Sequence, residues 1–224
     1  MEAAMKKHKI LHRVLALLLL ITLAVSLQAP QAQAAKSTKF NAKTAKKNLS
    51  LKYYKLEDGI LLICKNKNNY AVKLDGSISF LDTDKQVIAK SEDHNNCLGA
   101  KQTCALFYKA PLDANSSYVS YASCKKSIKV SKCGYKSYSK KIVTSTNMLP
   151  SIFNLTVMNN SGKKLDVIRV SCVIYDHSGK IVGCVQKYAS CYEKGATVTE
   201  TISYPASCSN PDKVKVYVDT AYQQ

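Results

Sequence analysis

The sequence is short of residue types that several common kinds of site require. It has eight glycines in 224 residues and no glycine-rich run of the kind that cradles phosphate groups. It has no tryptophan, and Arg169 is the only arginine beyond position 34. Nucleic-acid surfaces usually combine cations with arginine forks or stacked aromatic rings. We therefore expect neither a phosphate-binding loop nor a nucleic-acid partner.

Long hydrophobic runs are scarce as well. The sequence has one, at residues 14–27 near the N-terminus. Basic residues precede it and a small-residue Ala-x-Ala pattern follows it, which is typical of a secretory signal peptide at 1–34 that is cleaved after Ala34. A retained membrane anchor is the alternative, although this run is short for a bilayer span. No cysteine lies near the cleavage point, so we expect no lipoprotein anchor. The sequence predicts a secreted, extracellular protein, either free or associated with a cell wall.

The chain that follows contains an internal repeat. At an offset of 94 residues, FLDTDKQVIA (80–89) lies over IYDHSGKIVG (174–183). The same offset places Lys46-Lys47 on Lys140-Lys141, Asn66 on Asn160, Cys97 on Cys191 and Pro111 on Pro205. An ungapped match over this length indicates a tandem duplication.

Each copy has the pattern of strands and turns. Apolar residues alternate with polar ones over 74–80 and 168–174, which is the period of a half-buried strand. Turn residues follow at 83–85 and 177–180, and the final strands are expected at 118–123 and 213–218. No stretch beyond the N-terminal run has a sustained helical period. Short strands at this spacing predict an all-β fold of two β-sandwiches.

The strand pattern resembles that of the FxLYD-type modules of bacterial secreted proteins. Phe80-Leu81-Asp82 and Ile174-Tyr175-Asp176 carry the resemblance, although the first lacks the tyrosine and the second lacks the leucine. The resemblance implies two tandem immunoglobulin-like β-sandwich domains that are extracellular and non-enzymatic. The expected boundaries are a lead-in at 35–50, a first repeat at 51–124, a linker at 125–141 and a second repeat at 142–224.

The formal net charge of +18 is concentrated in the predicted lead-in and linker. Residues 35–50 carry five lysines and residues 124–141 carry seven, and neither stretch has an acidic residue. Such lysines could bind an anionic cell-wall polymer or a membrane surface, or they could form a self-repelling spacer that keeps two domains apart. The candidate polyanion-binding residues are Lys43, Lys46, Lys47, Lys125, Lys126, Lys129, Lys132, Lys136, Lys140 and Lys141.

All nine cysteines lie in the exported part, which favours disulfides. The candidate pairs are Cys97 with Cys104, Cys184 with Cys191, Cys64 with Cys124, and Cys172 with Cys208. Cys133 is left over as a free thiol. Sequence alone does not determine the connectivity, and Cys64, Cys104 and Cys172 could instead be buried small hydrophobic residues.

Catalytic patterns are weak. His94, Cys97 and Cys104 could supply three zinc ligands, but no repeated Cys-x2-Cys pair supports a metal site. Asp82 and Asp176 recur at one repeat position, where capping of a turn is the simpler interpretation. We therefore expect no enzymatic activity, no cofactor and no metal.

Two functions remain after these exclusions. The first is a secreted, non-catalytic binding or adhesion module that acts at a bacterial cell surface through weak polyanion contacts. The second is a structural or accessory extracellular protein with no small-molecule ligand, which could form a dimer linked through Cys133. A protein partner and the oligomeric state are left open.

Overall fold

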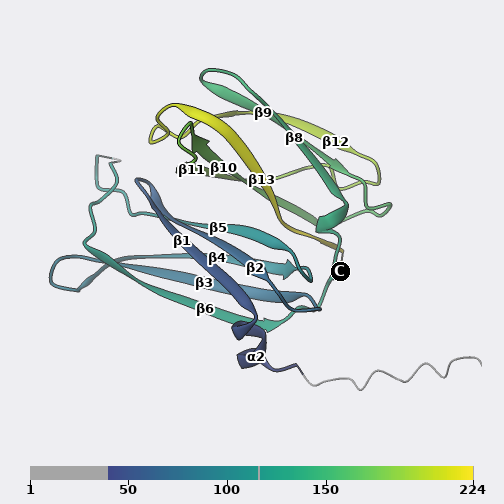
Figure 1. The fold of residues 1–224 in the computed structure, drawn as a ribbon, viewed down its shortest axis with the longest axis horizontal. Coiled ribbons are helices and arrows are strands. Elements are labelled where there is room, and N and C mark those ends of the chain that lie inside the picture. The colour runs from purple at the N-terminus through teal and green to yellow at the C-terminus, as the bar shows by residue number, and fades with distance from the viewer. Residues whose placement is uncertain (1–39, 116, 224) are drawn as a thin grey trace, which may run out of the picture. The chain divides into compact units, whose positions relative to one another are not determined.

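The computed structural model describes residues 40–115 and 117–223, so the predicted signal peptide and residues 35–39 of the first lead-in lie outside the described residues. The expected all-β fold is confirmed: Figure 1 shows strands throughout, and each strand pair is antiparallel. By contacts, residues 40–224 form one compact unit.

The first half contains a short helix and two three-stranded sheets, ordered β1-β2-β5 and β4-β3-β6. Its elements are α2 (Ala42–Lys47), β1 (Leu49–Leu56), β2 (Gly59–Asn66), β3 (Val72–Leu81), β4 (Val87–Leu98), β5 (Thr103–Lys109) and β6 (Ser123–Lys132). The side chains between these sheets form one buried cluster that includes Leu62, Phe80 and Tyr108. The two sheets therefore form a sandwich.

The second half repeats this arrangement with sheets ordered β12-β9-β8 and β11-β10-β13-β7. Its elements are β7 (Lys136–Ser137), the 3-10 helix η1 (Ser139–Lys141), β8 (Ile142–Met148), β9 (Ile152–Asn159), β10 (Val167–Asp176), β11 (Ile181–Tyr188), β12 (Thr197–Ser203) and β13 (Pro211–Gln223). Phe153, Leu155 and Ile168 lie in its buried cluster. Corresponding strands occupy corresponding places in the two halves.

The register of the repeat differs from the expected single offset. Asn66 donates to the carbonyls of Leu98 and Gly99, whereas Asn159 donates to the carbonyls of Tyr192 and Glu193. The counterpart of Asn66 is therefore Asn159 rather than Asn160. The first two strands of each copy are related by 93 residues, and β3, β4 and β5 are related to β10, β11 and β12 by 94, because the connection before β10 is longer. The last strands, β6 and β13, are related by 90, since Cys124 lies opposite Phe80 and Val214 lies opposite Ile174.

The predicted linker at 125–141 also differs from the structure. Residues 125–132 belong to β6, which pairs with β3 along its whole length, so this lysine-rich run is a strand. Ile128 and Val130 point into the core while the lysines remain exposed, and this alternation satisfies the period of a strand despite the charge. The strand expected at 118–123 is wrong, because Tyr118 forms only an isolated bridge with Leu112 and the next strand, β6, begins at Ser123.

The two sandwiches pack against each other. A third buried cluster joins the β1-β2-β5 sheet to the β10 and β13 strands, and it includes Leu61, Phe107, Val173 and Tyr217. The sequence of β2, GILLICKN, is apolar on both faces, which is the pattern of a strand covered on both sides. A spacer that keeps two domains apart does not fit this packing.

Candidate functional site

The ten candidate lysines are all exposed, and they fall into two groups. Lys43, Lys46 and Lys47 lie on α2, and four more lie on β6. The remaining three lie on β7 and η1, elements that contact β13 of the second sandwich. The stretch at 124–141 therefore contributes to both groups, whereas the stretch at 35–50 contributes only to the group on α2 and β6.

Local contacts hold α2 beside β6. Asn41 caps the helix by accepting a hydrogen bond from the Thr44 N–H, at 2.9 Å. Ala45 is fully buried against the core of the first sandwich. On the outer side, Lys46 Nζ donates to the carbonyl oxygen of Ile128 in β6, at 2.7 Å. These contacts join the lysines of α2 to those of β6.

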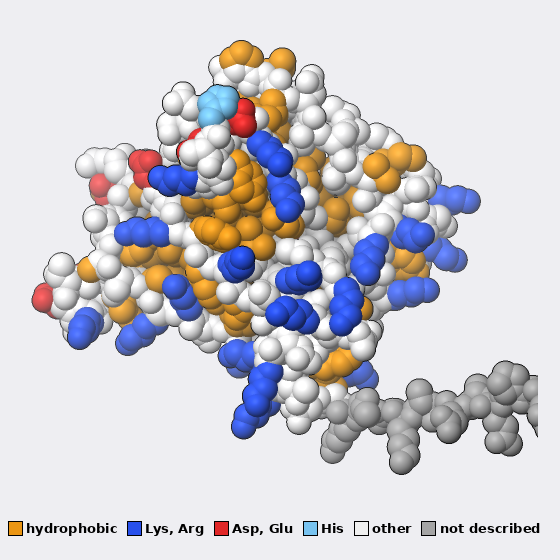
Figure 2. Space-filling view, viewed as in Figure 1, with side chains coloured by type: hydrophobic (Ala, Val, Ile, Leu, Met, Phe, Trp, Pro, Cys, Tyr) orange, Lys and Arg blue, Asp and Glu red, His pale blue; other side chains and the backbone are white. Residues whose placement is uncertain are grey.

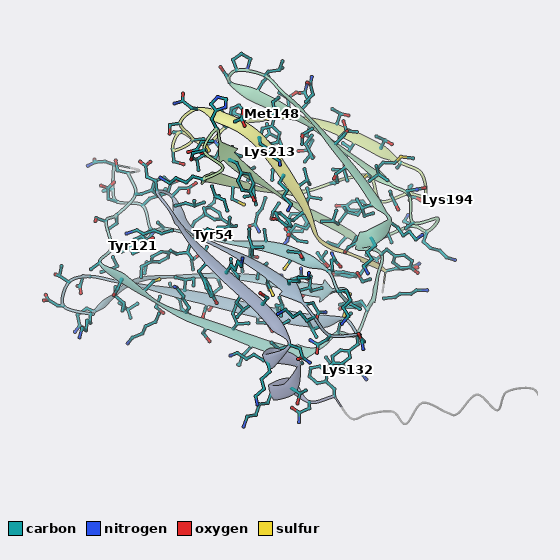
Figure 3. All side chains as sticks on the ribbon, viewed as in Figure 1. Tyr54, Tyr121, Lys132, Met148, Lys194 and Lys213 are labelled. Carbon is teal, nitrogen blue, oxygen red and sulfur yellow. The ribbon has the colours of Figure 1, made fainter. Side chains whose placement is uncertain are left out.

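The strand order brings further lysines to the same end of the sandwich. The Lys67 N–H donates to Asn48 O just after α2, and Lys101 Nζ donates to Lys67 O at 2.6 Å. Lys65 lies opposite Thr103, and Lys132 lies opposite Val72, where β3 begins. We call this set of exposed side chains the basic end: Lys43, Lys46, Lys47, Lys65, Lys67, Lys101 and Lys132. In Figure 3 the label of Lys132 stands next to α2.

Sequence reasoning missed Lys65, Lys67 and Lys101, because residues 51–123 are nearly neutral when counted along the chain. In the folded protein, however, many of the positive and negative side chains of this stretch lie at opposite ends of the strands. The acidic residues of this stretch are mostly in turns at the opposite end of the strands, where Glu57 and Asp58 join β1 to β2 and Asp82 and Asp84 join β3 to β4. Figure 2 shows the acidic side chains mainly toward the left of the view and lysines over much of the rest, with several around α2.

Buried asparagines fix the backbone beneath the basic end. Asn66 is fully buried, and its Nδ2 donates to the carbonyl of Tyr70 at 2.9 Å as well as to those of Leu98 and Gly99. Asn68 Nδ2 donates to Ala45 O and to Asn66 Oδ1. Since these bonds join the end of α2, the start of the β2–β3 connection and the β4–β5 turn, the lysines stand on an ordered surface.

The basic end can attract anions through its exposed lysines. Lysine presents a compact, strongly hydrated charge, which suits repeated weak contacts with phosphate or carboxylate groups. One lysine nearby is already engaged, since Lys126 lies 4.7 Å above the ring of Tyr53. Lys136, on the second sandwich, similarly lies 5.4 Å from the ring of Tyr138.

The cysteines adopt contacts other than the expected pairs, and all nine are free thiols. Cys97 Sγ lies 2.9 Å from Cys133 Sγ rather than against Cys104. Cys104 instead lies directly opposite Cys64 on the β2–β5 ladder, and this thiol neighbour, together with burial, raises the pKa of Cys104. Cys133 is thus not isolated, which weakens the hypothesis of a dimer linked through it.

The pair Cys184 and Cys191 also differs from expectation. Cys184 faces the cluster between the sandwiches, whereas Cys191 lies in the core of the second sandwich. A bond between them would have to cross the sheet, which the geometry of a disulfide does not allow without backbone movement. Cys64 and Cys124 both contact the first core, and Cys172 and Cys208 both contact the second, but neither pair is bonded.

Arg169 forms a buried charge network between the sandwiches that the sequence did not reveal. Its Nη1 lies 2.7 Å from Asp93 Oδ1, and its Nε lies 3.7 Å from Asp219 Oδ2. The backbone N–H groups of Phe107 and Ala105 donate to Asp93 and Asp219, at 3.0 and 2.7 Å. Burial raises the pKa of Asp219 to about 7, against the lowering effect of Arg169. The carboxylates thus satisfy the N–H groups of β5.

The predicted capping role of two recurrent aspartates is confirmed. Asp82 Oδ1 accepts a hydrogen bond from the Gln86 N–H at 2.8 Å. Asp176 Oδ1 accepts from the N–H groups of Ser178 and Lys180, each at 2.9 Å. Their oxygens are therefore used within the turns.

Across residues 40–115 and 117–223, no group of three or more His, Cys, Asp or Glu side chains is placed to hold a metal ion. Within the same ranges, no helix is long and apolar enough to cross a membrane.

Comparison with known proteins gives no family. No protein-family model matches the chain, and no curated protein matches it. Among solved structures, it is similar to one described as "putative beta-galactosidase from bacteroides fragilis", at 12% identity and a TM-score of 0.18. The alignment covers 66% of this chain and 28% of that one. A likeness this low carries no argument about fold or function.

Proposed function

We propose that the protein is a secreted, non-catalytic binding module that attaches to an anionic polymer of a bacterial cell surface through the basic end. The observation that carries the proposal is the gathering of lysines from α2, β2, the β4–β5 turn and β6 at one end of the first sandwich. The acidic turns at the other end leave this surface with a local positive charge.

The kind of contact follows from lysine chemistry. Exposed lysines bind extended polyanions through many weak, screened charge interactions, each worth about 1 kcal/mol near a charged surface. Such binding needs neither a deep pocket nor a cofactor. It favours a flexible polymer with regularly spaced phosphates, which can adapt to lysines on several strands.

The resemblance to FxLYD-type modules agrees with this proposal but remains a hypothesis. The all-β fold of paired antiparallel sheets is compatible with it. Secretion rests on the N-terminal sequence pattern and belongs to the proposal as well.

The proposal is tested by reversing charge at the basic end. Lys43 on α2, Lys67 in the connection after β2 and Lys132 on β6 are exposed, so we propose the triple variant Lys43→Glu, Lys67→Glu and Lys132→Glu. Sedimentation with purified anionic wall polymer at low salt is expected to show binding weakened roughly tenfold or more relative to the unaltered protein. Binding of the unaltered protein should be lost near 1 M salt, where the screening length is about 3 Å.

A matched control changes the same net charge elsewhere. Lys163, Lys194 and Lys213 are exposed on the second sandwich, and Figure 3 places the labels of Lys194 and Lys213 away from α2. Their triple replacement by glutamate is expected to affect binding much less. Equal losses in both variants would show that overall charge, rather than the basic end, drives attachment. Preference for anionic lipid vesicles over wall polymer would favour a membrane surface instead.

A further inference from the structure

The segment that joins the two sandwiches carries a thiol in contact with a second thiol far away in sequence. Cys133 lies between β6 and β7, and Cys97 lies near the end of β4, 36 residues earlier. Their sulfur atoms are 2.9 Å apart. Both thiols also approach the carbonyl oxygen of Tyr135, at 3.5 Å for Cys97 and 3.3 Å for Cys133. The backbone already holds these sulfurs together.

The surroundings give the two thiols different roles. Cys97 is fully buried, whereas Cys133 is partly exposed. The contact with Cys97 lowers the pKa of Cys133 to about 7, with a contribution from the N–H of Tyr135. The same contact and burial raise the pKa of Cys97. Near neutral pH a sizeable fraction of Cys133 is therefore ionised and accessible, whereas Cys97 keeps its proton.

We infer that Cys97 and Cys133 are a site of oxidative cross-linking, at which a low-molecular-weight disulfide converts the pair into an intramolecular disulfide. The Cys133 thiolate attacks one sulfur of the small disulfide, forms a mixed disulfide and releases one small thiolate. Cys97 then loses its proton to solvent and attacks Cys133 Sγ, which releases the second small thiolate. Two protein thiols are oxidised, and one small disulfide is reduced to two thiols.

The bond would fix the connection between the sandwiches. Tyr135 stacks on Tyr222 of β13, with ring centroids 4.4 Å apart, and Lys136-Ser137 pairs with the end of β13. Oxidation would therefore tie β4 of the first sandwich to a segment already packed on the second. The inference does not depend on the proposed binding of polymers, because it uses residues outside the basic end.

The test exploits the lysines around the two thiols. Trypsin separates Cys97 within residues 91–101, Cys104 within 102–109 and Cys133 within 133–136, so each of these peptides carries a single thiol. The reduced full-length protein is incubated with oxidised glutathione, alkylated in denaturant, digested and measured by mass spectrometry. The expected product joins peptides 91–101 and 133–136 with the loss of two hydrogens.

Two variants and a control make the result decisive. In Cys97→Ser the reaction should stop at glutathione bound to Cys133, because no second thiol can displace it. In Cys133→Ser, Cys97 should be recovered alkylated. Cys124→Ser alters another partly exposed thiol and should leave the cross-link intact. A Cys97–Cys104 link, a dimer through Cys133, or stable glutathione on Cys133 of the unaltered protein would overturn the inference.

Discussion

At the scale of single residues, Arg169 is the cation that pairs with the two buried carboxylates between the sandwiches. It is 4% exposed, and Asp93 and Asp219 lie on either side of it. A buried ion pair of this kind adds little net stability compared with apolar packing, but removal of one partner is costly because the other charge remains buried.

Replacement of Arg169 by leucine is expected to lower the free energy of unfolding by about 3 kcal/mol at pH 8. Chemical denaturation monitored by circular dichroism measures this loss. The triple variant Arg169→Leu, Asp93→Asn and Asp219→Asn should lose less than the single variant. Its asparagines can still accept from the Phe107 and Ala105 N–H groups, and no charge is left unpaired. A triple variant as unstable as the single one would contradict this account.

Because the pKa of Asp219 is raised on folding, we expect the free energy of unfolding to depend on pH. Burial raises its pKa from 3.8 to about 7 in the folded protein. Between these values the folded state holds a proton that the unfolded chain has released. This contribution to stability is therefore present at low pH and is lost as pH rises through about 7. Arg169, Asp93 and Ser171 are the neighbouring side chains that set this balance.

Comparison with Asp219→Asn isolates this effect, because the asparagine does not titrate. Between pH 4 and pH 8 the unaltered protein should lose up to about 4 kcal/mol more unfolding free energy than the variant, at roughly 1.4 kcal/mol per pKa unit. Urea denaturation at several pH values gives the difference. If the unaltered protein instead gained stability relative to the variant as pH rises, Asp219 would be ionised in its pair with Arg169 and the prediction would be wrong.

At the scale of elements, β3 shows how one strand accommodates a large side chain from the opposing sheet. Tyr108 of β5 is fully buried, and its hydroxyl has no hydrogen-bond partner within the described residues. A Cβ atom on Gly76 of β3 would lie 1.9 Å from that hydroxyl. The glycine therefore makes room for the tyrosine.

Gly76→Ala is expected to destabilise the protein by about 1–3 kcal/mol through overpacking. Tyr108→Phe should be close to neutral, since it removes a buried hydroxyl without a recorded partner. The double variant should recover much of the stability lost in Gly76→Ala. Thermal or chemical unfolding of the four proteins measures the coupling, and strictly additive losses would contradict the proposed clash.

At the scale of the whole molecule, the described residues form one compact unit of two sandwiches. Val173, Leu61 and Phe107 are buried in the cluster between them, and Gln102 of the first sandwich donates to Val218 O of the second at 2.6 Å. Because apolar burial and hydrogen bonds both cross this boundary, we expect the sandwiches to unfold together.

Val173→Asp should uncouple them. A single cooperative unfolding transition is expected for the unaltered protein and two transitions for the variant, since the aspartate would place an unpaired charge in the interface. Differential scanning calorimetry distinguishes the two cases. Ser145→Asp, on an exposed position of β8, serves as the control and should keep one transition. Two transitions in the unaltered protein would show that the interface does not couple the sandwiches.

Strands and turns could be predicted from the sequence where their signal lies in residues close together along the chain. Alternation over 74–80 and 168–174 correctly predicted β3 and β10, and the recurrent Asp82 and Asp176 correctly predicted capped turns. It misassigned β6 because the four lysines of this strand concealed an alternation that depends on Ile128 and Val130. It could not predict the basic end, the contact of Cys97 with Cys133, or the role of Arg169. Each of these depends on which strands meet in space.

The most direct test of the proposed function is the salt dependence of binding to anionic wall polymer. The slope of the logarithm of the binding constant against the logarithm of salt concentration reports how many ionic contacts are made. The account predicts a steep slope for the unaltered protein, a clearly shallower one for the triple variant at Lys43, Lys67 and Lys132, and nearly the original slope for the triple variant at Lys163, Lys194 and Lys213. Equal slopes for all three proteins would contradict binding through the basic end.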